Sequence, residues 1–114
     1  MKGQEEEYTP PDEVKTYAVV PAFELSSMPV YRNRVEPDYP VELKSREIEG
    51  EVLLTATIDQ EGKVVKVTVK RSDDELFSKA AIAALKQCSF SPGMQNGKPV
   101  TTTIDIPIKF ILDE

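Results

Sequence analysis

The sequence contains no histidine, and Cys88 is its single cysteine. Without an imidazole the chain lacks the most frequent general base and the most frequent zinc ligand, and one cysteine cannot close an intramolecular disulfide. As a nucleophile, Cys88 would have no histidine to activate it, whereas a small apolar thiol on the buried stripe of a helix is typical of a core residue. These absences exclude most common catalytic and metal sites.

Long apolar runs and clusters of basic residues are missing as well. No segment approaches the roughly 20 apolar residues of a membrane-spanning helix, and the N-terminus lacks the basic and apolar pattern of a signal peptide. The chain has 14 Lys and Arg against 20 Asp and Glu, for a net charge of −6, so a phosphate backbone would find no basic patch. We expect no nucleic-acid partner, and either a cytosolic protein or the soluble part of a longer one.

The carboxylates of the central region form two short groups, and local structure accounts for both. One group, at Asp59 and Glu61, belongs to a predicted turn, and the other, Asp73-Asp74-Glu75, lies where a helix is predicted to begin. Neither group supplies enough oxygen ligands at the spacing that a calcium loop requires. The sequence therefore predicts no enzyme, no metal site and no cofactor.

Proline and acidic residues gather at the N-terminus. Six of the nine prolines lie in the first 40 residues, and residues 1–13 carry five acidic side chains against one basic side chain. Because such a composition buries little apolar surface, we expect residues 1–34 to form an extended, Pro-rich and partly disordered leader with one short strand near 17–20. Residues 35–114 are predicted to form one small domain.

The predicted domain contains five elements in the order helix, strand, strand, helix, strand. Apolar and polar residues alternate in the strands, as expected where one face of a sheet is buried. The pattern predicts a short helix within 38–46, strands over 51–58 and 63–71 joined by a tight turn, a helix from 75 to about 88 that begins with a capping box of Ser72 and Glu75, and a last strand over 100–112.

Connection rules then predict an α+β fold, in which a three-stranded antiparallel sheet of order 2-1-3 packs against two helices. The helical crossover returns the last strand parallel to the second strand, so the last strand pairs with the first and becomes an edge. Pro107 favours this position, because a proline removes a ladder donor and is tolerated at an edge.

Two interpretations of this edge are open from the residues alone. An extended peptide could add to it as a further strand through main-chain hydrogen bonds. Alternatively, Thr101, Thr103, Asp105 and Lys109 simply protect an edge that binds nothing.

Seven short motifs occur in a specific order and spacing over about residues 35–112. They are Glu36-Pro37-Asp38-Tyr39-Pro40, Ile48-Glu49-Gly50-Glu51-Val52, Ile58-Asp59-Gln60-Glu61-Gly62-Lys63-Val64, Phe77-Ser78-Lys79-Ala80-Ala81, Phe90-Ser91-Pro92-Gly93, Asn96-Gly97-Lys98-Pro99-Val100 and Ile106-Pro107-Ile108-Lys109-Phe110. Each motif alone is common, but together they resemble the TonB C-terminal domain family.

This resemblance implies a periplasmic domain at the end of an inner-membrane energy transducer that works with a proton-driven motor complex. Such a domain binds the TonB box, a short segment of an outer-membrane transporter, by strand addition to its last strand and transmits energy for substrate uptake. The family's N-terminal membrane anchor is not among these residues, so we expect a part of a longer protein. The implied partner-binding residues are Val100, Thr101, Thr102, Thr103, Ile104, Asp105, Ile106, Lys109 and Tyr39.

Two positions depart from the family pattern. Cys88 and Ser89 stand where the family often has Trp and a basic residue, which changes the packing of the second helix. Glu42 stands where well-known members have a basic residue, which changes any charge pairing with a transporter. The alternative interpretation is a structural or sensory cell-envelope domain that associates with a second copy through its last strand and has no transport role.

Overall fold

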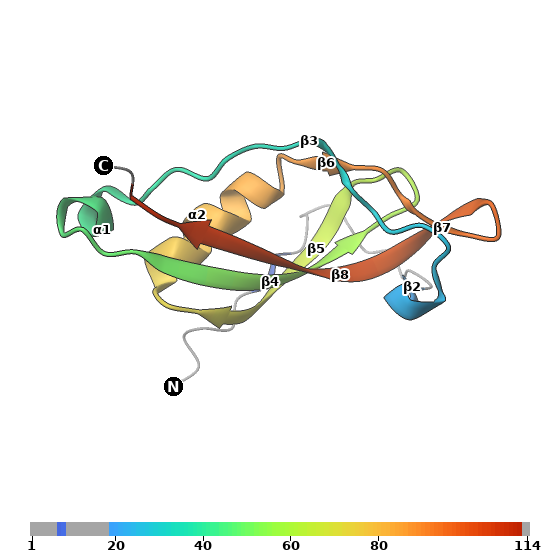
Figure 1. Cartoon of the computed structure of the whole chain (residues 1–114), viewed down its shortest axis with the longest axis horizontal. Coiled ribbons are helices and arrows are strands. Elements are labelled where there is room, and N and C mark those ends of the chain that lie inside the picture. Colours follow the sequence, from blue (N-terminus) through green and yellow to red (C-terminus); the bar gives the residue numbers. More distant parts are fainter. Residues whose placement is uncertain (1–6, 9–18, 113–114) are drawn as a thin grey trace.

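The computed structural model describes residues 7–8 and 19–112 and has a mixed α+β fold, as the sequence predicts. The helices are η1 (Ala22–Glu24, a 3-10 turn), α1 (Val41–Ser45) and α2 (Glu75–Leu85). The strands are β1 (Glu7–Tyr8), β2 (Val19–Val20), β3 (Tyr31–Asn33), β4 (Gly50–Ile58), β5 (Val64–Ser72), β6 (Ser89–Phe90), β7 (Gly93–Gln95) and β8 (Lys98–Phe110). Figure 1 shows the three long strands β4, β5 and β8 along the length of the molecule.

These three long strands lie side by side in the order β5–β4–β8, and both pairings are antiparallel. β4 pairs with β8 without a register shift, from Gly50 opposite Phe110 to Ile58 opposite Thr102. The alternating sequence explains why one face is buried, because successive side chains of a strand point to opposite faces. In β4 the fully buried residues are Val52, Leu54, Ala56 and Ile58.

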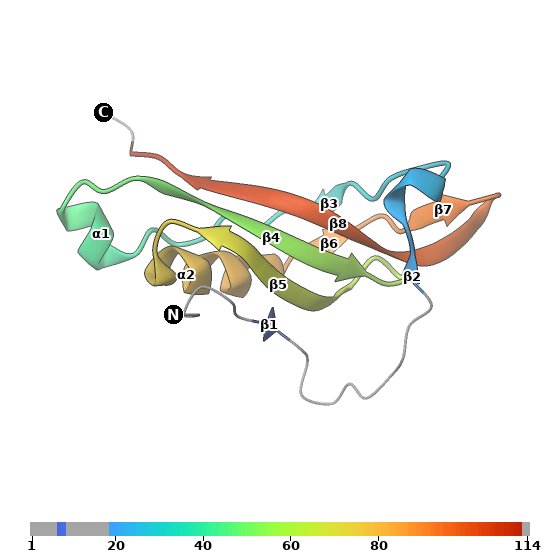
Figure 2. The ribbon, with the colours of Figure 1, turned by 90° about the horizontal axis from the view of Figure 1, so that it is seen from below.

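One face of the sheet is covered by α2, which lies beside β4 and β5 (Figures 1 and 2). Phe77, Ala81 and Leu85 form one helical stripe and are fully buried in the core. The two-stranded ribbon β3–β6 lies on the same side of the sheet (Figure 1), and there Tyr31 stacks on Phe90 with ring centroids 4.6 Å apart. The core therefore lies between the sheet and a layer made of α2 and this ribbon.

Helix α2 begins at Glu75, as predicted, but its N-cap differs from the prediction and it ends at Leu85, before the predicted end near Cys88. Asp74 is the N-cap, and its carboxylate accepts a hydrogen bond from the backbone N–H of Leu76 at 2.8 Å. The predicted capping box is wrong, because the Ser72 hydroxyl instead donates to the Asp74 carbonyl at 2.8 Å. At the other end, the N–H of Cys88 donates to the carbonyl of Leu85 at 3.0 Å, a bond of the 3-10 type that closes the last turn.

The sheet is larger than the predicted three strands. β1 adds to β5 in antiparallel orientation, β2 adds to β8 in parallel orientation, and β7 pairs with the start of β8. The prediction that the last strand is an edge along its whole length is therefore wrong. A short strand near 17–20 is predicted, but its pairing with β8 is not, and β1 and β7 are too short for their alternation to be recognised from a sequence.

The leader contributes part of this structure. β2 lies within the strand predicted near 17–20, although residues 17–18 are outside the described residues. The disorder predicted for the leader concerns mainly residues 1–6 and 9–18, which also lie outside them. Among residues 7–8 and 19–112, no helix has the length and the apolar character that a membrane crossing requires.

Candidate docking edge

The backbone of β8 presents its hydrogen-bonding groups alternately to β4 and to the opposite side. Glu51 of β4 has both of its backbone groups turned toward β5: its carbonyl accepts from Asp73 N–H at 3.1 Å, and its N–H donates to the Asp73 carboxylate at 2.9 Å. Glu51 is the partner of Lys109, so these two residues form a non-hydrogen-bonded pair and the backbone groups of Lys109 face away from β4.

Since the β4–β8 register has no shift, the same orientation recurs at every second residue of β8. The backbone N–H and C=O groups of Thr103 and Asp105 therefore face outward, as do those of Lys109. Pro107 has the same parity, and its missing N–H breaks no bond to β4. This outward side of β8 between Thr103 and Lys109 is called the open edge below.

The first part of β8 is already paired with other segments of the chain. Val100 lies opposite Gly93 in the β7–β8 hairpin, and Thr101 and Thr102 lie opposite β2. The Thr102 hydroxyl donates to the carbonyl of Val20 at 2.6 Å, and the Thr102 side chain is 0% exposed. Three of the nine predicted partner-binding residues are therefore covered, namely Val100, Thr101 and Thr102.

The open edge contains the remaining strand residues of the prediction, which are Thr103, Ile104, Asp105, Ile106 and Lys109. Within the described part of the chain, no strand pairs with β8 on this side beyond Thr102. Ile104 and Ile106 point toward the core side of the sheet and pack on it, whereas the exposed Asp105 and Lys109 lie on the opposite face. The structure thus brings these residues together along one accessible strand.

Asp105 is held on the outer face of the sheet by two neighbours. Its carboxylate accepts a hydrogen bond from the Thr55 hydroxyl at 2.9 Å and forms an ion pair with the Lys70 amine at 3.1 Å. The hydrogen bond from Lys70 is the largest influence and lowers the pKa of Asp105 below its usual value. Desolvation opposes this shift, and the weaker effects of the Thr55 hydrogen bond and the Lys70 charge lower the pKa further. Asp105 is therefore an anion, and its two partners, Thr55 of β4 and Lys70 of β5, belong to the same sheet.

Tyr39 lies apart from the open edge, in an aromatic cluster at the end of β8. Its ring stands edge-on to the rings of Phe77 and Phe110, with centroids 5.7 Å away in both cases. Its hydroxyl donates to the carbonyl of Ile48. Tyr39 therefore has a structural role here, and a contact of its side chain with a partner remains a prediction.

A groove that the sequence does not predict runs beside the open edge. It has a volume of about 340 Å³. One wall is built by Pro29, Val30, Tyr31 and Arg34, the other by Ile104, Asp105, Ile106 and Pro107, and Phe90 completes it. The sequence around residue 30 carries no periodic pattern, and only the pairing of β3 with β6 brings it to this position.

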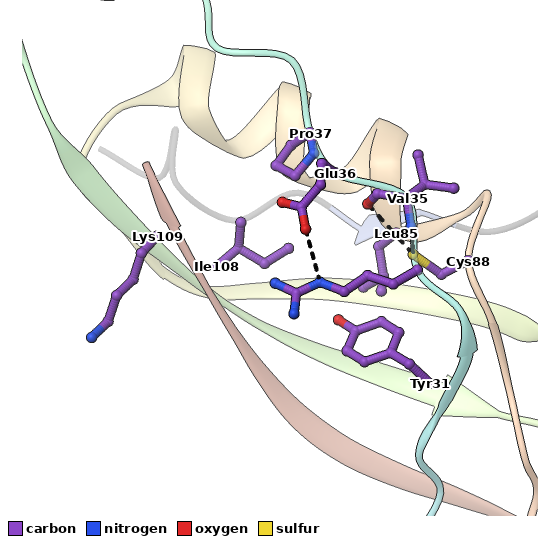
Figure 3. Close-up of a pocket in the computed structure, with 9 residues that line it drawn as sticks. Tyr31, Val35, Glu36, Pro37, Leu85, Cys88, Ile108 and Lys109 are labelled. Carbon is purple, nitrogen blue, oxygen red and sulfur yellow. Dashed lines mark hydrogen bonds and ion pairs between the residues drawn. The ribbon is translucent and has the colours of Figure 1, made fainter. Parts of the chain in front are cut away.

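Two of these wall residues, Tyr31 and Arg34, also line a second, much smaller cavity, to which Leu85 of α2 contributes as well (Figure 3). There the Arg34 side chain forms an ion pair with Glu36 at 3.4 Å and lies 5.1 Å from the centre of the Tyr31 ring. The backbone N–H of Val35 donates to the sulfur of Cys88 at 3.3 Å. This cavity, of about 20 Å³, has room for little more than a water molecule, and the buried Cys88 belongs to the core, as predicted.

No group of three or more Cys, Asp or Glu side chains within residues 7–8 and 19–112 is arranged to hold a metal ion.

Comparison with known proteins identifies the family. The sequence profile described as Gram-negative bacterial TonB protein C-terminal matches residues 35–112. Protein TonB of Vibrio cholerae is 37% identical over 81 residues, which are 70% of this chain and 33% of that protein. Protein TonB of Xanthomonas campestris is 28% identical over 83 residues, which are 72% of this chain and 37% of that protein. The chain thus spans about a third of the length of these curated relatives.

The fold agrees with this relationship. A solution NMR structure of the Pseudomonas aeruginosa TonB CTD superposes with a TM-score of 0.66 at 24% sequence identity, covering 78% of this chain and 91% of the other. From Val35 to Leu112, this chain belongs to the family of Gram-negative bacterial TonB protein C-terminal domains.

Proposed function

We propose that this chain is the periplasmic docking module of a TonB-like energy transducer and that it binds the TonB box of an outer-membrane transporter by strand addition to the open edge. The observation that supports this proposal is the row of outward backbone groups at Thr103, Asp105 and Lys109, next to which the described chain lays no strand. An added strand satisfies these groups while alternate side chains provide specificity.

Energy transduction in this proposal is mechanical. β8 is paired with β4 over its full central length, and β4 in turn with β5, so a force on the bound segment is carried by a sheet and not by a single loop. In the complete protein, an inner-membrane anchor would connect the module to a proton-driven motor complex. The family consists of energy transducers and docking proteins and not of enzymes.

The alternative, an envelope domain that pairs with a second copy of itself through the same edge, is less well supported. Pro107 lies at the middle of the open edge and removes one donor, and the exposed Asp105 and Lys109 place charges along it. These features oppose sheet-to-sheet pairing of identical edges. A short peptide can instead place small side chains opposite them.

The proposed function is tested by titrating isotope-labelled chain with peptides that carry TonB-box sequences of several transporters. We expect amide shifts confined to Thr103–Lys109. Thr103→Pro should weaken binding about tenfold or more, because it removes an outward N–H, while Thr103→Val, which keeps the N–H, should bind like the original chain. No shift with any peptide at millimolar concentration would refute the proposal. The alternative would be favoured if the chain dimerised in sedimentation experiments and if the same amides were protected from hydrogen exchange in the dimer.

A further inference from the structure

We propose that the groove between the leader and the open edge is a specificity pocket, which selects docked peptides carrying apolar side chains at alternate positions. The inference rests on the proposed function, because it concerns the side chains of a strand added to β8. Its distinctive feature is that one wall of the groove, Pro29 to Arg34, precedes the family domain at 35–112.

Strand geometry determines which side chains would reach the groove. Ile104 and Ile106 point to the side of the sheet on which the β3–β6 ribbon lies. Side chains of neighbouring strands at the same level share a face, so every second side chain of an added strand projects to that side. The ribbon stands beside the edge there, and these side chains therefore enter the groove.

The lining makes an apolar occupant the best match. Val30 is 61% exposed although it is a β-branched apolar residue, and Ile104 is only half-buried. The nearest carboxylate, that of Asp105, is already engaged by Thr55 and Lys70 on the opposite face. Covering Val30 and Ile104 removes apolar surface from water. An acidic side chain placed between them would lose hydration and would meet only Arg34, which is already paired with Glu36 at 3.4 Å.

The leader wall is fixed in place before any peptide arrives. Val30 donates its N–H to the Ser91 hydroxyl at 3.0 Å and accepts from the Ser91 N–H at 2.8 Å. The next residue, Tyr31, stacks on Phe90. Both backbone groups of Val30 are thus hydrogen-bonded to Ser91, which holds this residue in the wall of the groove. A preformed wall lowers the entropic cost of ordering a bound peptide.

The test compares charge insertion in the groove with charge insertion elsewhere. Val30→Glu places a carboxylate in the groove, and Val41→Glu places the same group on α1 at a residue that is 79% exposed. We expect Val30→Glu to weaken binding of a short peptide of alternating Val and Thr about tenfold. A loss of this size corresponds to the transfer free energy of one aliphatic side chain that is no longer buried. Val41→Glu should leave binding unchanged.

Peptide variants supply the reciprocal evidence. Replacing one Val of the peptide by Asp should reduce affinity when that side chain faces the groove, and replacing a neighbouring Thr should not. Methyl signals of Val30 and Ile104 should shift together with the amides of the open edge.

The outcomes separate the two proposals. If the original chain binds the peptide at the open edge and Val30→Glu binds it equally well, the groove does not select side chains, while strand addition stands. If the original chain binds neither this peptide nor TonB-box peptides, both proposals are overturned. A tenfold loss for Val30→Glu with unchanged binding for Val41→Glu supports the pocket.

Discussion

The two halves of β8 belong to one strand but differ in their partners, since β4 pairs only with Thr102–Phe110. Lys98–Thr102 is covered by β7 and β2, and its Thr101 and Thr102 side chains are 4% and 0% exposed. Beyond Thr102, in the described chain, the outward backbone groups meet no further strand. Whether a part of β8 is available to a partner therefore depends on which other segments of the chain pair with its outward side.

The covered half also shows how the leader is attached. The Ser26 N–H donates to the carbonyl of Met94 at 2.8 Å, and the N–H of Met94 donates to the carbonyl of Ser27 at 2.9 Å. The leader therefore adds to β7 as well as to β8, and it then continues as the wall of the groove. One segment closes the first half of the edge and shapes the approach to the second half.

The largest effect is expected from a core residue that packs on the end of the open half. Phe77 is fully buried and stacks on Phe110, the last residue of β8, with ring centroids 4.5 Å apart. Phe77→Ala should lower the free energy of unfolding by about 3–5 kcal/mol, as is usual for such truncations, measured by urea denaturation. Tyr39→Phe, which keeps the ring and loses only the hydrogen bond to Ile48, should cost about 1 kcal/mol. If Phe77→Ala and Tyr39→Phe lowered the free energy of unfolding equally, the packing of Phe77 on Phe110 would not anchor the end of β8.

A somewhat smaller effect tests the direction of the backbone groups. Ile104 faces β4 with its N–H, whereas Thr103 faces outward. Ile104→Pro should therefore lower the free energy of unfolding by about 3 kcal/mol, and Thr103→Pro by less than about 1 kcal/mol. Both are measured by urea denaturation in the absence of peptide. The reverse order would mean that the open edge presents the wrong set of backbone groups, and strand addition at Thr103 would be excluded.

A third change converts part of the covered half into edge. Thr102→Val removes the hydroxyl that binds the Val20 carbonyl but keeps the shape of the buried side chain. We expect a loss of about 1 kcal/mol from the attachment of β2, detected as faster amide hydrogen exchange at Thr101, and peptide-induced shifts that extend to Thr101. The matched variant Thr103→Val should change neither the hydrogen exchange at Thr101 nor the extent of the peptide-induced shifts. Unaltered exchange in Thr102→Val would mean that β2 is held mainly by its backbone.

The sequence predicts the long elements correctly because each of them buries a regular pattern. β4, β5 and β8 alternate over nine or more residues, and α2 carries an apolar stripe, so their burial follows from their own residues. The cover of Thr101 and Thr102 could not be predicted, since it depends on two residues of the leader, Val19 and Val20. Tyr39 was assigned by resemblance to partner binding, but its environment is an aromatic cluster that only the tertiary structure brings together.

The smallest effect concerns the ion pair on the outer face of the open half. Because Lys70 lowers the pKa of Asp105 in the folded chain, the pair stabilises the fold above the unfolded carboxyl pKa of about 4, and this contribution disappears as the pH falls through the folded value. Both side chains are about half exposed, so the contribution is at most about 1 kcal/mol. Asp105→Asn should therefore be less stable than the original chain by about 0.5 kcal/mol at pH 7, and the difference should vanish in strong acid. In a Lys70→Met background the pH dependence of that difference should be largely absent. A difference that grows as the pH falls would place the Asp105 pKa above its unfolded value and contradict the pairing with Lys70.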